Sequence, residues 1–112
     1  MAILKQQKLF GTVLRTRVLL ATSLLEETFP SELTRTLNLK LFPVQRVLDA
    51  LETEGVLVSR KLGIERRFNL NPRFFAYPEL KSLLVRLAEQ DRALVAALAS
   101  RRARPRRRLK SL

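Results

Sequence analysis

The sequence predicts a mainly helical domain with one small β-hairpin. Only three glycines and five prolines occur among its 112 residues, so loops are expected to be few and short. Leucine and valine recur at helical spacing through most of the chain. Residues 56–70 instead combine strand composition with alternating apolar and polar positions. The length is that of one small domain.

Two helices are expected in the N-terminal part. Apolar residues recur at helical intervals within residues 9–27, which predicts a first helix there. Pro30 has a fixed φ and no N–H, so it suits the first turn of a second helix over residues 30–37. Asn38 stands where a residue that tolerates left-handed φ would end that helix.

A third helix follows a short connector. Pro43 is a second proline suited to a helix start, and Gly55 supplies the C-terminal stop. The side chains between them form an apolar face and an opposite polar face. The apolar face consists of Val44, Val47, Leu48 and Leu51. Two short helices joined by a tight turn, the second amphipathic, form a helix-turn-helix pattern.

A β-hairpin is expected directly after this third helix. Residues 56–60 and 65–70 are the predicted strands, and residues 61–64 are the predicted turn. Alternation in the second strand places Phe68 and Leu70 inward. A hairpin in this position is a wing, so residues 1–76 are predicted to form a winged helix-turn-helix domain.

The last apolar pattern predicts one long helix that begins at Pro78 and runs for about 22 residues, or about 33 Å. Its apolar positions follow a heptad spacing interrupted by one acid. These positions are Leu80, Leu84, Leu87, Asp91, Leu94 and Leu98. The face packs either on its own domain or against a second copy. We favour the second copy because the helix is long for so small a body, which predicts a homodimer through residues 77–100.

The net charge of +12 is unevenly distributed. Residues 101–112 carry basic residues without an acid, and such a block is expected to be disordered without a partner. It is either a solubilising tail or an arm that follows a polyphosphate, and we favour the arm because arginine binds phosphate bidentately. The arginines of this arm are Arg101, Arg102, Arg104, Arg106, Arg107 and Arg108.

Several functional classes are excluded or disfavoured by composition. Cysteine and histidine are absent, which removes thiol chemistry, imidazole metal sites and histidine-based triads. No glycine-rich phosphate loop is present. We therefore expect no enzyme, no cofactor and no metal. The longest uncharged runs are less than half a membrane span, so a cytoplasmic protein without a membrane partner is expected.

The order of these elements resembles the winged helix-turn-helix transcription regulators, and most closely their ArsR-like group. The resemblance covers residues 9–98. Residues 10–19 are similar to the first-helix signature of the group, and residues 44–57 are similar to its recognition helix running into the wing. The metal sensors of the group use Cys, His and acidic clusters, so metal sensing by that route is excluded here.

The resemblance implies that the third helix enters the major groove of DNA. Gln45 can pair with adenine and Arg46 with guanine, both from the first turn of the predicted helix. Asp49 can accept from cytosine or orient Arg46. Phe42 replaces the capping Ser or Thr of many members, and it either contacts a thymine methyl group or packs against Phe29, which we favour. The alternatives are a solvated Gln45 and a surface ion pair between Arg46 and Asp49.

The other candidate DNA contacts are to the phosphate backbone. They are Thr34, Arg35, Lys40, Arg60, Lys61, Arg66 and Arg67. The predicted function is a homodimeric, sequence-specific regulator that binds double-stranded DNA, with another protein of a transcription complex as a further partner. The alternative is a winged-helix adaptor in a nucleoprotein complex, which binds RNA or joins a transcription or replication assembly.

Overall fold

The computed structural model describes residues 7–100, and the expectations for the arginine-rich arm lie outside them. The prediction of a mainly helical domain with one small antiparallel hairpin is confirmed. The elements are α1 (Val13–Leu25), α2 (Pro30–Leu37), α3 (Leu41–Thr53), β1 (Leu57–Leu62), β2 (Glu65–Leu70), α4 (Tyr77–Glu89) and a last helical segment over residues 92–100.

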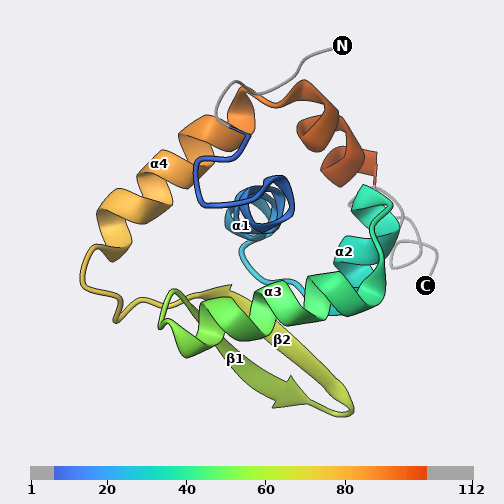
Figure 1. The fold of residues 1–112 in the computed structure, drawn as a ribbon, viewed down its shortest axis with the longest axis vertical. Coiled ribbons are helices and arrows are strands. Elements are labelled where there is room, and N and C mark those ends of the chain that lie inside the picture. Colours follow the sequence, from blue (N-terminus) through green and yellow to red (C-terminus); the bar gives the residue numbers. More distant parts are fainter. Residues whose placement is uncertain (1–6, 101–112) are drawn as a thin grey trace, which may run out of the picture.

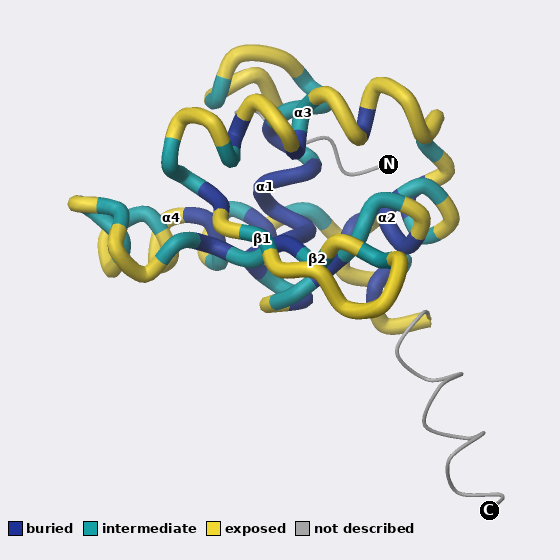
Figure 2. The backbone as a smooth tube through the Cα atoms, turned by 90° about the horizontal axis from the view of Figure 1, so that it is seen from below, coloured by how far each residue is buried: buried dark blue, intermediate teal, exposed yellow. Residues whose placement is uncertain are grey.

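Helix α1 lies at the centre, and the other elements surround it (Figure 1). It packs against α3, α4 and β2, and residues 18–23 are all buried, which explains why this helix is apolar around most of its circumference. Two buried hydroxyls are satisfied locally, since Thr22 Oγ1 donates to the Val18 carbonyl at 2.7 Å and Ser23 Oγ donates to the Leu20 carbonyl at 2.7 Å. The burial is visible as the dark core of Figure 2.

Helix α1 is shorter at both ends than the predicted range of residues 9–27. Thr12 caps its start, because the Thr12 side chain accepts from the Arg15 N–H at 3.0 Å. Residues 7–10 form a turn instead, and the Phe10 N–H donates to Thr16 Oγ1 at 3.2 Å. The start of α1 is therefore set by the capping side chain of Thr12 and not by the apolar residues that precede it.

Helices α2 and α3 form the predicted pair. Asn38 ends α2 in the left-handed conformation, with φ 56°. Helix α3 begins at Leu41, two residues earlier than Pro43, because a proline at the third helical position loses no hydrogen bond. Gly55, with φ 83°, ends α3, and the Val56 N–H then donates back to the Leu51 carbonyl at 3.0 Å.

The hairpin is anchored to the helices through β2. Leu62 pairs with Glu65, so Gly63 and Ile64 form a two-residue loop, and the φ of 67° at Gly63 is one that such loops require. On the other edge of β2, the Thr28 N–H donates to the Phe68 carbonyl at 3.0 Å, and the Phe68 N–H donates to the Thr28 carbonyl at 2.7 Å. The connection between α1 and α2 thus extends the small sheet.

The expectation of one long C-terminal helix is wrong. Helix α4 ends at Glu89, and a second helix covers residues 92–100 at an angle to it (Figure 1). Asp91 caps this second helix, since its Oδ1 accepts from the Leu94 N–H at 3.1 Å. Asp91 is therefore a helix cap and not a polar member of a heptad face.

The heptad leucines lie in the core of a single chain. Leu84, Leu94 and Leu98 are 0%, 0% and 4% exposed, and Leu80 and Leu87 pack half-buried against the same core. The bend at Asp91 wraps both helices around α1, so packing on the chain's own domain is the arrangement observed. Leu84, Leu94 and Leu98 are therefore not exposed to a second copy, so the heptad face is not the free surface that the predicted dimer interface requires.

We predict that Asp91→Ala lowers the free energy of unfolding by about 1 kcal/mol, because the Leu94 N–H at the start of the last helix loses its side-chain cap. Urea unfolding measures the change. Asp49→Ala, which removes an exposed acid outside any cap, is the matched control. If residues 77–100 instead formed one helix paired with a second chain, removing the charge from its apolar face would raise stability.

Candidate nucleic-acid interface

The outward face of α3 carries all four residues predicted to read bases. Phe42, Gln45, Arg46 and Asp49 stand at positions i, i+3, i+4 and i+7, and all four are exposed. The opposite, apolar face of α3 is buried and packs against the core. Because α3 begins at Leu41, Gln45 and Arg46 lie in its second turn and not in the first turn as expected.

Phe42 does not pack against Phe29, so that interpretation is wrong. Its ring is 66% exposed, and the guanidinium carbon of Arg46 lies 5.6 Å from the ring centroid. The Phe29 ring lies instead beneath Arg67, at 4.9 Å. Within residues 7–100, Arg46 makes no ion pair with Asp49. The guanidinium N–H donors of Arg46 are therefore available to an acceptor from outside the chain.

The hairpin places four cations in two like-charged pairs. Arg60 stands directly opposite Arg67, and Lys61 stands directly opposite Arg66. Like charges at directly opposed positions destabilise a sheet. The fold must therefore either neutralise each pair or leave it as a site of concentrated positive charge.

Glu27 neutralises the first pair. Its carboxylate accepts from Arg60 at 2.9 Å and lies 3.8 Å from the Arg67 guanidinium, which also pairs with Glu65 at 2.9 Å. Arg60 and Arg67, both predicted to contact phosphate, are thus already paired with acids of the chain. Sequence reasoning missed Glu27 because it lies 33 residues from Arg60 and no local spacing connects the two.

The second pair has no such counter-ion. Lys61 and Arg66 are both exposed, and neither has an acidic partner within residues 7–100. They stand next to the loop, near the far end of the hairpin. Of the four predicted hairpin contacts, these two are the ones that keep their charge free for a phosphate.

The start of α3 adds a third positive region. Lys40 and Arg35 are exposed, and no side chain in the described part of the protein caps the first N–H groups of α3. The partial positive charge of a helix N-terminus therefore adds to that of Lys40. Thr34 is less suitable than expected, because its hydroxyl already donates to the Ser31 carbonyl at 2.8 Å.

These features lie on one side of the molecule. Helix α3 and the hairpin occupy the lower side of Figure 1, and α4 and residues 92–100 lie across α1 from them.

The described part of the chain holds no group of three or more possible metal ligands, and none of its helices is long and apolar enough to cross a membrane. No family model, curated protein or solved structure matches the chain.

We predict that Glu27→Gln destabilises the fold by about 0.5–1 kcal/mol, because two opposed arginines then lose their shared counter-ion. Thermal or urea unfolding at low salt measures the effect, which should shrink at high salt as the repulsion is screened. Glu89→Gln, an exposed acid of α4 without an ion pair among the described residues, is the control. A loss that is independent of salt would contradict the charge argument.

Proposed function

We propose that this chain is a sequence-specific regulator of transcription that binds double-stranded DNA. The observation that carries the proposal is that the outward face of α3 (Phe42, Gln45, Arg46 and Asp49) is exposed beside a hairpin whose Lys61–Arg66 pair has no counter-ion among the described residues. The hairpin cations supply affinity for a polyanion, and the outward face of α3 supplies groups that can read bases.

Helix α3 would read bases from the major groove, where each base pair shows a distinct pattern of donors and acceptors. Arg46 donates two hydrogen bonds to guanine, Gln45 pairs with adenine, and Asp49 accepts from cytosine. The exposed ring of Phe42 fits a thymine methyl group, the alternative that its exposure now favours. Lys61 and Arg66 bind backbone phosphates, and Lys40 with the start of α3 binds another.

We further propose that the fold is a winged helix-turn-helix of the ArsR-like kind. The hairpin follows the third helix directly, and the Thr28–Phe68 pairing supports this view because it fixes the hairpin relative to the helices. Dimerisation through the leucines of residues 77–100 is not part of this proposal, since those leucines fill the core of one chain. Each chain would present one α3 to DNA.

We predict that Arg46→Ala relaxes base specificity and weakens binding to the preferred sequence by about 1–3 kcal/mol, the value of one bidentate base contact. Competition between preferred and single-base-altered duplexes measures the change. Arg35→Ala, which removes an exposed arginine of α2 predicted to meet phosphate, should weaken all sequences alike. An equal loss on all duplexes for Arg46→Ala would make Arg46 a backbone contact as well.

We predict that the double variant Lys61→Ala with Arg66→Ala reduces the slope of log K against log salt by about two units, because two phosphate contacts are lost. Salt titrations of duplex binding give the slope. The double variant Arg86→Ala with Arg92→Ala removes the same charge from exposed positions across α1 and should leave the slope nearly unchanged. Equal changes in both variants would mean that only net charge matters.

A further inference from the structure

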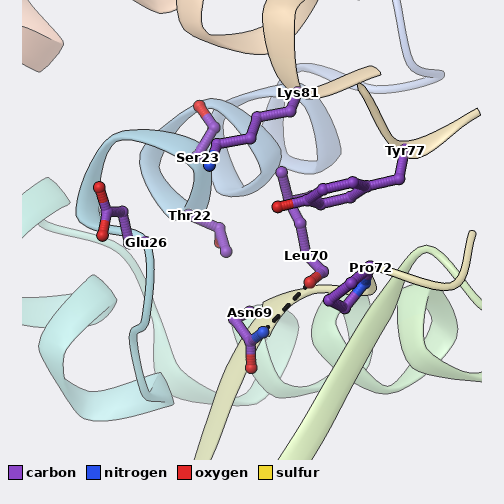
Figure 3. A pocket seen from close by; sticks show the side chains of 8 residues that line it. All are labelled: Thr22, Ser23, Glu26, Asn69, Leu70, Pro72, Tyr77 and Lys81. Atoms are coloured by element: carbon purple, nitrogen blue, oxygen red, sulfur yellow. Dashed lines mark hydrogen bonds between the residues drawn. The ribbon is translucent and has the colours of Figure 1, made fainter. Parts of the chain in front are cut away.

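A cleft of about 180 Å³ opens between the end of α1, the end of β2 and the start of α4 (Figure 3). It lies apart from the outward face of α3, since none of its lining residues comes from that helix. Its walls combine apolar groups, such as Leu70, with side chains of both charges. The arrangement of those charges identifies what the cleft can hold.

The α1 side of the cleft offers hydrogen-bond acceptors. Ser23 is only 4% exposed, and its hydroxyl proton is committed to the Leu20 carbonyl at 2.7 Å, so the oxygen has only acceptor capacity left for a ligand. The Glu26 carboxylate stands at the end of α1, where the helix carries a partial negative charge. Both features favour a cationic group with N–H donors.

The α4 side of the cleft offers donors. Tyr77 and Lys81 belong to the start of α4, where the helix carries a partial positive charge. The Lys81 ammonium lies 5.9 Å from the centroid of the Tyr77 ring, and the lysine side chain extends from α4 towards the end of α1 (Figure 3). This side favours an anion such as a carboxylate.

The two charges that line the cleft do not neutralise each other. Within residues 7–100, neither Glu26 nor Lys81 forms an ion pair, although both line the same cleft and both are exposed. A ligand with one positive and one negative group would satisfy both at once. The apolar surface of Leu70 and Pro72 can then contact the remainder of such a ligand.

Glu26 is also a costly residue for the fold alone. Its backbone has φ 69° and ψ −39°, a positive φ that favours glycine. Its carboxylate stands at the negative end of α1, where an anion is unfavourable. Glycine would relieve both costs, so the placement of a glutamate here is better explained by a bound cation than by stability.

We propose that this cleft binds a small zwitterion, a free L-α-amino acid. Its ammonium group is held by Glu26 and Ser23, and its carboxylate is held by Lys81 and Tyr77. The cleft would give the protein a small-molecule input. The proposal does not depend on DNA binding, because it rests on other residues.

The test is a titration of the ¹⁵N-labelled full chain with each standard L-amino acid separately at millimolar concentration. At least one should shift the amide signals of Ser23, Glu26 and Lys81 saturably. Its carboxamide and its deaminated acid should each bind about tenfold more weakly or worse, because each lacks one charged contact. No shift with any amino acid, or equal binding of the two truncated compounds, would overturn the proposal.

Variants separate binding from folding. Glu26→Gly should raise the melting temperature of the free protein yet weaken amino-acid binding by about tenfold or more. Lys81→Met should weaken binding by a similar factor, and Lys8→Met, the same change at an exposed lysine outside the cleft, should leave it unchanged. Binding by Glu26→Gly as tight as by the unaltered chain would contradict the assignment.

Discussion

The four residues between α1 and α2 hold the hairpin in place. Glu26 ends α1, Glu27 lies between two opposed arginines of the hairpin, and Thr28 exchanges two backbone hydrogen bonds with Phe68. Phe29 then starts α2 and lies beneath one of those arginines. This one segment therefore sets where the hairpin lies relative to the helices, and every surface formed by α3 and the hairpin depends on it.

The same segment makes the two pairs of opposed cations in the hairpin different from each other. Glu27 pairs with Arg60 and Arg67, whereas Lys61 and Arg66 have no counter-ion within residues 7–100. A buried apolar face keeps α3 beside that hairpin with its polar stripe outward. The proposed DNA interface thus uses the Lys61–Arg66 pair, whose repulsion no acid of the described residues reduces. The Arg60–Arg67 pair, which Glu27 neutralises, contributes to the stability of the hairpin.

Much of the fold follows from local signals in the sequence. Asn38 and Gly55 mark helix ends because their backbone conformations disfavour most other residues, and alternation locates the hairpin. The bend at Asp91 could not be found in this way, since a heptad spacing serves a core within one chain as well as a pair of chains. The exposed stripe of α3 follows from helical spacing, whereas the pairing of Glu27 depends on contacts between distant parts of the chain.

The most direct test of the proposed function is a selection of bound sequences from a pool of random duplexes, with the full chain at physiological salt. The proposal predicts one enriched motif that Arg46→Ala degrades at a defined base position. A motif arranged as an inverted repeat would additionally indicate two chains per site. Failure to enrich any motif, together with tighter binding to structured RNA than to duplex DNA, would contradict the proposal and favour a role in a ribonucleoprotein.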